Sequence, residues 1–349
     1  MTERAPESAR RGHVLLARLD SLGDLLLAGP AVRAVAGSAS KVTLLVGEGR
    51  CPDAWLLPGV DEAIEFAAPW VVFEPGPVEP AKISALVTAV REAQVDAALI
   101  LTSFHQSPLP LALLLRMAGV RWIGAISEDY PGSLLDLRHR IRDPLPEPER
   151  NLSLAHAAGF LPDERGARLA VRRPLPDPAR WTGSDPYVVF HPGASTSSRR
   201  PTAEHSKSLV AGLVDAGRRV IITGSASEAT LAAYVADGRA HDLSGQLDLP
   251  HLAAVLERAS VVVAPNTGPA HLAAAVETPV VSLFAPVVPA SSWAPYGVPT
   301  IILGNQEAAC RDSRARICPL PDHPCLSSIR PEEVVDAVGR LAFTGVGAP

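Results

Sequence analysis

The sequence predicts an α/β protein of two domains, each built on a parallel, doubly wound sheet. Short apolar runs that suit buried strands alternate with helical patterns along most of the chain. At 349 residues, the chain is longer than one typical hydrophobic core requires. A Pro-rich polar segment, residues 171–186, separates the two series of strands and helices and is the expected linker.

The first half predicts one domain, residues 13–170. The preceding residues, 1–12, carry charges with no apolar core after them, so we expect a disordered leader rather than a secretory signal. Apolar runs, many of them β-branched, predict strands at 13–19, 41–47, 63–67, 95–101 and 120–126. Helical patterns lie at 25–36, 81–93, 107–118 and 151–159.

The second half repeats this alternation and predicts another domain, residues 187–330. Strands are expected at 187–190, 219–224, 241–245, 261–264 and 279–285. Helices are expected at 203–216, 251–258 and 270–276, and a final helix at 331–341 lies in the last segment, 331–349. Strands that alternate with helices of these lengths favour parallel sheets.

Composition excludes several classes of protein. A net charge of −5 and only 5% aromatic residues argue against nucleic-acid binding. No apolar run approaches the roughly 20 residues that span a bilayer. Four cysteines in a chain of this length indicate reduced thiols rather than a disulfide framework, and we expect a cytoplasmic protein.

The segment 260–285 holds the most informative turn. A buried strand is followed by Pro-Asn-Thr-Gly-Pro and then by a helix start, and backbone N–H groups at such a turn attract anions. Asn266, Thr267 and His271 are its hydrogen-bonding side chains. An ordinary βαβ unit, with Asn266 and Thr267 as helix caps, explains this segment equally well when it is considered alone.

Two other polar segments have plain structural explanations. The turn at 20–24 follows the first strand, where nucleotide-binding folds place ligands, but it has neither GxGxxG nor a P-loop pattern. On its own, Asp24 is best explained as a first-turn residue that complements the helix dipole. The run RHRIR at 138–142 is best explained as a solvated surface segment, with a cradle for an acidic ligand as the alternative.

Two long motifs resemble glycosyltransferase family 9, the heptosyltransferase family. PNTGPAHLAAAVETPVVSLFAP is similar to its pattern (D/N)TGxxHLAAAxxxPxxxLFGP, and ARLDSLGDLLLAGPAVRAV is similar to (V/I)RxSSxGDxxxxxPAxRAL. The resemblance covers about 13–341. It implies a GT-B architecture, in which two Rossmann-like domains face each other across a cleft, with the acceptor on the first domain and the donor on the second. It also implies that the last helix packs back on the first domain.

The resemblance assigns roles to single residues. Asp24 maps onto the catalytic base, and His271 and its neighbours map onto the donor site. HPGASTSSRRPTAEH resembles the family's diphosphate-binding segment, but the Lys and Trp of that segment are missing. In two other family motifs a usual Asp is replaced, by Asn266 in one and by Val288 in the other. Arg199 is the first candidate to replace the Lys, and the spacing equally permits Arg200. The implied donor-binding residues are Ser195, Arg199, Arg200, Glu228 (ribose), Leu247 (adenine), Asn266, Thr267, Gly268 and His271. The candidate acceptor-binding residues are Ser21, Gly23, His105, Arg138 and Arg140.

The implied reaction is inverting transfer of a heptose or related sugar from an ADP-linked donor to an acceptor hydroxyl. The acceptor could be a lipopolysaccharide core, another envelope glycan or a small natural product. We expect no cofactor or metal, because the spacing of Cys310, Cys318 and Cys325 is not the paired CxxC of a zinc site. The resemblance leaves an alternative, since some members of the family hold a metal through cysteines near this end of the chain. A monomer is expected, at most peripherally associated with the inner face of the plasma membrane. The alternatives are a nucleotide-sugar-binding protein that has lost catalysis and a GT-B epimerase.

Overall fold

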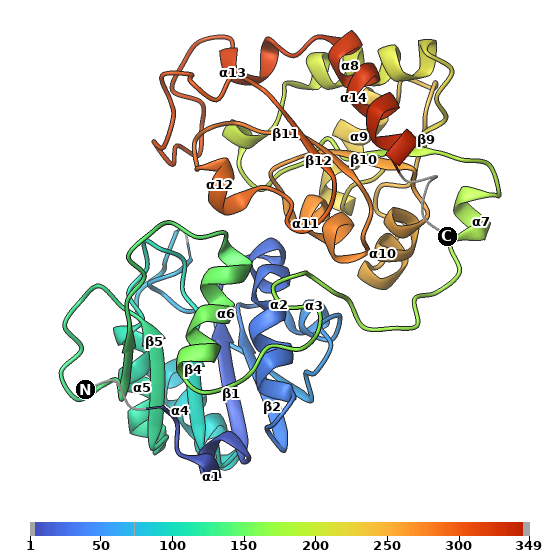
Figure 1. Ribbon diagram of the computed structural model, residues 1–349. Helices are drawn as coiled ribbons and strands as arrows, with labels where there is room; N and C mark the ends of the chain where they lie inside the picture. The colour runs from blue at the N-terminus through green and yellow to red at the C-terminus, as the bar shows by residue number, and fades with distance from the viewer. Residues whose placement is uncertain (1–3, 73, 345–349) are drawn as a thin grey trace. The chain divides into compact units, whose positions relative to one another are not determined.

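The computed structural model describes residues 4–72 and 74–344, which form two compact units (Figure 1). The first unit is Met1–Arg172 and the second is Arg173–Pro349, so the boundary lies inside the segment expected to be the linker. None of the helices in these described ranges has the length and hydropathy of a bilayer-spanning segment.

The first unit is built on a parallel sheet with the strand order β3-β2-β1-β4-β5-β6. Its strands are β1 (His13–Arg18), β2 (Lys41–Val46), β3 (Glu62–Glu65), β4 (Ala97–Ile100), β5 (Trp122–Ile126) and β6 (Leu137–His139). Its helices are α1 (Glu7–Arg10), α2 (Leu22–Ala36), α3 (Cys51–Ala54), α4 (Pro80–Glu92), α5 (Leu109–Ala118) and α6 (Glu147–Ala157). The strand order reverses between β1 and β4, and such switch points are where doubly wound folds bind ligands.

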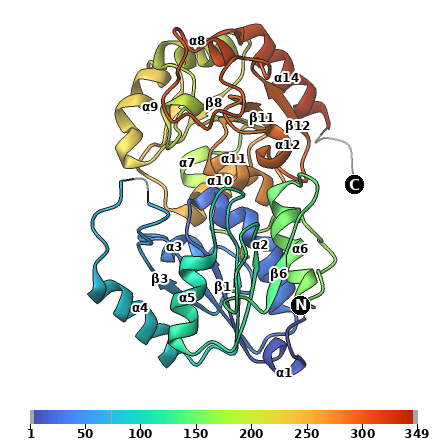
Figure 2. The ribbon, with the colours of Figure 1, turned by 90° about the vertical axis from the view of Figure 1, so that its left-hand side faces the viewer.

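Apolar side chains on both faces of this sheet hold the helices. Helices α4 and α5 pack on one face through a buried cluster that includes Leu15, Leu86 and Leu115, and α2 and α6 cover the other face (Figure 2). The Asn151 amide of α6 donates a hydrogen bond of 3.1 Å to the Leu27 carbonyl of α2. This bond fixes the start of α6 beside α2 at the carboxyl edge of the sheet.

The second unit repeats the topology, with the order β12-β11-β10-β7-β8-β9 and a switch point between β7 and β10. Its strands are β7 (Val188–Phe190), β8 (Val220–Ile222), β9 (His241–Asp242), β10 (Val261–Pro265), β11 (Val280–Leu283) and β12 (Thr300–Leu303). Its helices are α7 (Ala179–Thr182), η1 (Ser197–Arg199), α8 (Ala203–Asp215), η2 (Ala226–Glu228), α9 (Ala229–Ala236), α10 (Leu249–Glu257), α11 (Gly268–Ala275), α12 (Ala290–Trp293), α13 (Pro324–Ser327) and α14 (Pro331–Thr344).

One expectation about the ends of the chain is wrong. Residues 4–12 are not a disordered leader: they include α1, Ala5 is buried, and the Arg10 guanidinium donates to the carbonyls of Ala5 (3.1 Å) and Gly159 (3.0 Å). Residues 1–3 lie outside the described residues. Helix α14 places its apolar face, with Val334 and Val338, inside the core of the second unit and against α8.

Candidate functional site

Asp24 lies at the carboxyl edge of the first sheet, in the first turn of α2. Ser21 is the N-cap of this helix and forms a capping box with Asp24. The Ser21 hydroxyl and backbone N–H donate to Asp24 Oδ2 at 2.6 and 3.2 Å. The helix-capping explanation is therefore structurally correct, but 15% of the Asp24 side chain still reaches the surface, so a proton-transfer role stays open to it.

Arg18, the last residue of β1, organises this edge of the sheet. Its side chain is completely buried, and Nη2 donates to Asp24 Oδ1 at 2.7 Å. The same guanidinium forms an ion pair with Asp20 (Nε–Oδ2, 2.9 Å) and with Glu147 of α6 (Nη1–Oε2, 3.5 Å). The sequence analysis included Arg18 only as one position of the first motif and assigned it no role. The available signal was a charged residue at the end of an otherwise apolar strand.

Burial and ion pairing act in opposite directions on these carboxyl groups. Burial opposes ionisation of Asp24, but Arg18 and the Ser21 hydrogen bonds outweigh it and hold the Asp24 pKa below its usual range. Burial raises the pKa of Asp20 to about 6, although Arg18 favours the ionised form. Burial also raises the pKa of Glu147. The edge thus carries one strongly ionised carboxylate beside two groups that hold protons more readily.

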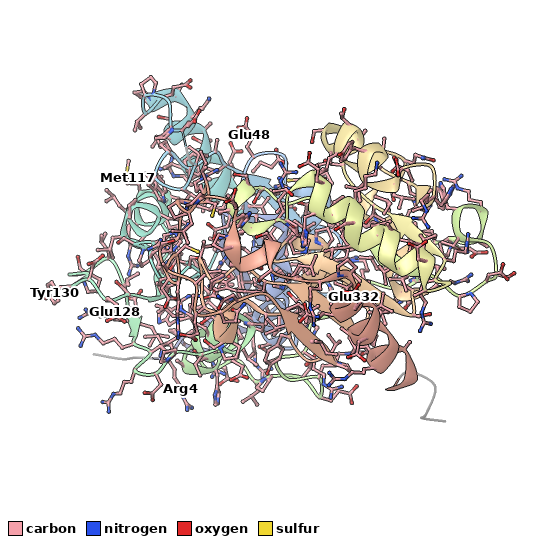
Figure 3. The ribbon with its side chains drawn as sticks, turned by 90° about the horizontal axis from the view of Figure 1, so that it is seen from above. Arg4, Glu48, Met117, Glu128, Tyr130 and Glu332 are labelled. Carbon is pink, nitrogen blue, oxygen red and sulfur yellow. The ribbon has the colours of Figure 1, made fainter. Side chains whose placement is uncertain are left out.

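The candidate acceptor residues do not all lie together. Ser21 and Gly23 belong to the Asp24 turn, and His105 is exposed in the loop after β4, where its ring contacts Phe104 with centroids 5.3 Å apart. Arg138 and Arg140 line a separate hollow of about 660 Å³, whose lining shares no residue with the Asp24 turn. The other lining residues are Arg4, Glu128, Leu137, His139, Ile141, Arg142 and Ala157. Arg4 and Glu128 are at the surface of this unit (Figure 3).

This hollow shows that the run at 138–142 is more than a solvated surface segment. Its first residues form strand β6, which pairs with β5, and the Arg138 Nε donates to the Ser127 carbonyl at 3.1 Å. Burial lowers the pKa of His139, whose Nε2 lies 3.0 Å from the Ser153 hydroxyl. The guanidinium groups around a neutral imidazole form a basic surface.

At the switch point of the second unit, the loop after β7 and the turn after β10 come from adjacent strands. Asn266 is 4% exposed, and its Nδ2 has no hydrogen-bond partner among the described residues. Thr267 is the N-cap of α11, Gly268 begins that helix, and His271 is buried within it. A buried amide without a partner next to a helix N-terminus suits an anionic or hydroxyl-bearing ligand.

Glu228 lies in the η2 turn that follows β8. The Ser225 backbone N–H and hydroxyl both donate to Glu228 Oε2 at 2.8 Å. Burial raises the pKa of this carboxyl, but the Ser225 bonds and the charges nearby, including Arg200, outweigh it and lower the pKa. Gly193 fits closely beside it, because an added Cβ would lie 1.9 Å from Glu228 Oε1.

The remaining donor-site candidates lie around this turn. Arg200 and Glu228 line one hollow of about 700 Å³, and Arg199, on η1, is not part of its lining. Ser195 is exposed in the loop after β7. Leu247 is half-buried just after Gly245, whose N–H donates to the Gly224 carbonyl at 2.9 Å and so joins the two turns.

His191 is a site residue that sequence reasoning treated only as part of a turn. It is 4% exposed, its Nδ1 lies 3.1 Å from the Thr223 hydroxyl, and burial lowers its pKa to about 4. The ring is therefore neutral at physiological pH and links the first two strands of this sheet at the ligand edge. No sequence pattern that we used distinguishes such a histidine from a loop residue.

Cys51, Cys310, Cys318 and Cys325 carry free thiols. In the part of the chain that the structure describes, no group of three or more His, Cys, Asp or Glu side chains is arranged to hold a metal ion.

Two Rossmann-like units with the same strand order, each with polar side chains at its switch point, define a two-domain α/β protein of the GT-B fold class. The family model of glycosyltransferase family 9 (heptosyltransferase) matches residues 83–322. The chain therefore belongs to this family and is a glycosyltransferase.

Individual relatives agree with this assignment. Lipopolysaccharide heptosyltransferase 1 of Pseudomonas aeruginosa is 34% identical over 122 residues, a match that spans 34% of each chain. The structure of E. coli ADP-heptose LPS heptosyltransferase II superimposes with a TM-score of 0.75 at 19% identity, over 96% of this chain and 100% of that one. E. coli heptosyltransferase WaaC with ADP-2-deoxy-2-fluoro heptose gives a TM-score of 0.70 at 22% identity, over 94% and 99%. These two structures show the shared fold.

Proposed function

We propose that this glycosyltransferase transfers a heptose, or a closely related sugar, from an ADP-linked donor to an acceptor hydroxyl, with inversion at the anomeric carbon. Two of the relatives described above are named lipopolysaccharide heptosyltransferases, and a third is a heptosyltransferase bound to ADP-2-deoxy-2-fluoro heptose. The acceptor is then a cell-envelope glycan such as a lipopolysaccharide core. The observation that carries the proposal is the partly exposed Asp24 carboxylate, held at a ligand-binding edge by Arg18 and Ser21.

In the proposed step, Asp24 takes the proton of the acceptor hydroxyl while that oxygen bonds to the anomeric carbon. The bond from this carbon to the diphosphate oxygen breaks, and its electron pair stays on the diphosphate. One carboxylate opposite the leaving group is what an inverting displacement requires. General-base catalysis of this kind contributes about 10²–10⁴ in rate.

The second unit would hold the donor. Glu228 would accept hydrogen bonds from the ribose hydroxyls, Leu247 would pack on the adenine, and Asn266 with His271 would bind sugar or phosphate oxygens. Arg200 shares the hollow of Glu228, which favours it over Arg199 as the diphosphate ligand. The N–H groups at Gly268, with Ser195 and Thr267, would stabilise the leaving group without a metal ion.

The basic hollow at Arg138 and Arg140 would bind the anionic part of the acceptor. We propose that the protein acts as a cytoplasmic monomer whose acceptor is carried by the inner face of the plasma membrane. This arrangement would account for a basic surface on a chain whose net charge is −5.

Asp24→Asn tests the proposal because it preserves the shape of the side chain and removes its basicity. We expect transfer to fall by about 10²–10⁴-fold while ADP affinity stays within about twofold. Mass spectrometry of the product from ADP-heptose and a heptose-free core acceptor measures transfer, and calorimetry measures ADP binding. Retained turnover in Asp24→Asn would remove Asp24 from this role. Donor that binds to the wild type without hydrolysis or transfer would instead favour a binding protein that has lost catalysis.

A further inference from the structure

Arg18 is surrounded by more carboxyl groups than one guanidinium can neutralise. Asp20 follows it along the chain, Asp24 comes from α2 and Glu147 comes from α6. The other cation at this cluster is Arg150 of α6, 3.8 Å from Glu147 and bonded to the Thr102 carbonyl. Three carboxyls facing two guanidinium groups leave one excess negative charge when all are ionised. Arg18, Asp20, Asp24, Glu147 and Arg150 are called the Arg18 cluster below.

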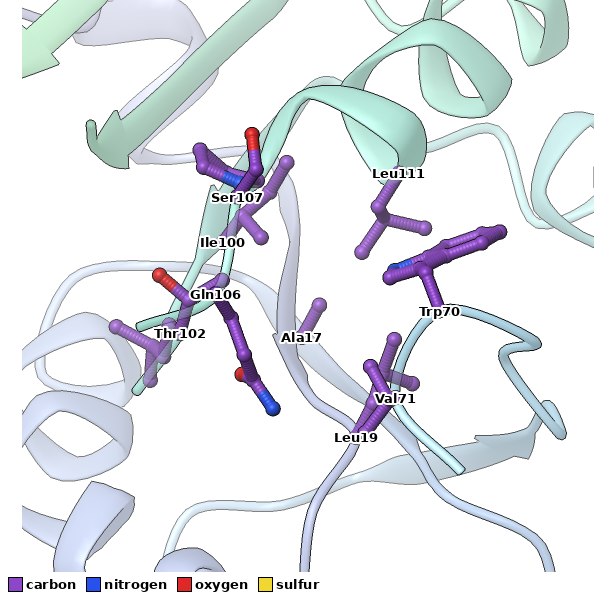
Figure 4. A pocket seen from close by; sticks show the side chains of 11 residues that line it. Ala17, Leu19, Trp70, Val71, Ile100, Thr102, Gln106, Ser107 and Leu111 are labelled. Carbon is purple, nitrogen blue, oxygen red and sulfur yellow. The ribbon is translucent and has the colours of Figure 1, made fainter. Parts of the chain in front are cut away.

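Within the Arg18 cluster, Asp20 has a second anchor that holds it in place. Gln106, in the loop after β4, donates from Nε2 to Asp20 Oδ1 at 2.6 Å. The Gln106 Oε1 in turn accepts from the Ser103 N–H at 3.2 Å. Figure 4 shows the Gln106 side chain extending from its loop toward the end of β1, beside the small pocket that Leu19 and Trp70 also line. Asp20 is therefore a built part of this edge rather than a flexible surface residue.

Asp20 and Asp24 bind different nitrogens of the same guanidinium. The Asp20 carboxylate lies 2.9 Å from Nε as an ion pair without hydrogen-bond geometry, and Asp24 accepts a hydrogen bond from Nη2 at 2.7 Å. A base that is paired with a full positive charge and accepts hydrogen bonds from Ser21 holds a further proton weakly. A second carboxylate that pairs with the same cation weakens the effect of that cation on the first carboxylate. It also adds its own negative charge, and both effects increase the proton affinity of the first carboxylate.

We propose that Asp20 is a positioning residue that holds Arg18 through Nε and gives Asp24 enough proton affinity to act as the base. This inference rests on the proposed function of Asp24. Uptake of the acceptor proton by Asp24 then removes the excess negative charge of the Arg18 cluster. The family pattern that this segment resembles has a serine at this position.

The proposal makes the rate depend on the ionisation of Asp20. The groups that face Asp20 are Arg18, Asp24, Glu147 and Gln106, with Arg150 behind Glu147. Burial raises the Asp20 pKa to about 6, so a proton resides on Asp20 below that pH. In that state the positive charge of Arg18 is not shared with an ionised Asp20, so it lowers the proton affinity of Asp24 more strongly. We therefore expect kcat to fall as the pH drops through 6.

Asp20→Asn tests this dependence, and Asp20→Ser repeats the test with the smaller residue of the family pattern. At pH 8, kcat should be about tenfold below wild type, short of the ~10²–10⁴-fold loss for a removed base, with KM within about twofold. The decline near pH 6 should disappear from both variants. Asp53→Asn is the matched control, because Asp53 is an arginine-paired aspartate of the same unit, 2.8 Å from Arg50. It should keep the wild-type profile.

A second measurement separates this proposal from the proposed function. Carboxyl ¹³C shifts of labelled aspartates, assigned with Asp24→Asn, report the titration of Asp24 in the absence of any substrate. Asp24 should titrate at lower pH in Asp20→Asn than in wild type. An unchanged Asp24 titration, or a wild-type kcat profile in both Asp20 variants, would overturn the proposal. An enzyme without transfer activity whose Asp24 titration shifts would overturn only the proposed function.

Discussion

At the scale of single residues, ionisation of the buried Asp20 carboxylate lowers the stability of the folded protein. Its pKa is about 6 in the folded protein against an ordinary 3.8, so the folded state binds the proton more tightly than the unfolded chain. The stabilisation from this proton is complete below about pH 4 and is lost as the pH rises through 6. The Asp20→Asn variant has no carboxyl group to ionise at this position, so its stability does not decrease in this way. We expect the variant to be about 1–3 kcal/mol more stable than wild type at pH 8.

Urea unfolding at pH 4, 6 and 8 measures this difference. It should shrink to a small fraction of its pH 8 value at pH 4, where Asp20 is protonated in the folded state and partly protonated in the unfolded chain. A variant that is less stable than wild type at pH 8 would show that the ion pair with Arg18 outweighs the burial of the charge. A variant that is more stable but slower would show that this carboxylate is kept for activity.

The residue scale also shows what the sequence could predict of the site. The position of Asp24 and of the Asn266 turn followed from motifs that place polar residues after buried strands, and the structure has them there. The burial of Arg18 could not be predicted, because it depends on Glu147, which lies 129 residues away. The proposed preference for Arg200 over Arg199 likewise rests on the position of Glu228, which the sequence does not give.

At the scale of helices, two glycines test how α14 packs. Gly212 of α8 faces the start of α14, and an added Cβ would lie 2.7 Å from Pro331 Cβ. Gly212→Ala should therefore force the helices apart and destabilise the second unit by about 1–2 kcal/mol, despite the better helix propensity of Ala. Gly339, inside α14, has its nearest neighbour 3.9 Å away, so Gly339→Ala should stabilise by about 0.5–1 kcal/mol.

Thermal unfolding of the two variants and the wild type measures whether each substitution stabilises or destabilises the protein. If α14 left the second unit and packed elsewhere, both substitutions would act as simple glycine-to-alanine changes in a helix and both would stabilise. The opposite signs are thus specific to the close approach of α8 and α14.

The same helix shows the limit of prediction for whole elements. A final helix was predicted at the right place, but an amphipathic pattern indicates only that an apolar face is buried, not against what. Long apolar strands such as β1 were predicted within about a residue. Strand β6 was missed because Arg138 and His139 break the apolar pattern, whereas β12 was missed although its four residues, TIIL, form a continuous apolar run. The Ala-rich α9 was missed beside the Glu228 turn.

At the scale of the whole molecule, the two units carry different halves of the proposed reaction, each at its own switch point. Their cores are separate: one buried cluster is formed by residues 15–135 and another by residues 188–341. A ligand that binds one unit should stabilise that unit in particular. At a free concentration about 100 times Kd, the expected stabilisation is about 2.7 kcal/mol.

ADP should therefore slow hydrogen exchange in the second unit, most of all at the loop after β7, at η2 and at the start of α11, and leave α2 and β1 of the first unit unchanged. Gly193→Ala should abolish this protection, because its Cβ displaces the Glu228 carboxylate from the place where Ser225 holds it. Gly224→Ala is the matched control: its Cβ would lie 3.4 Å from Glu228 Cβ, an ordinary contact, and protection should persist. Equal behaviour of the two variants would mean that Glu228 does not bind the nucleotide. Protection of β1 rather than of the second unit would place the donor on the wrong half of this chain.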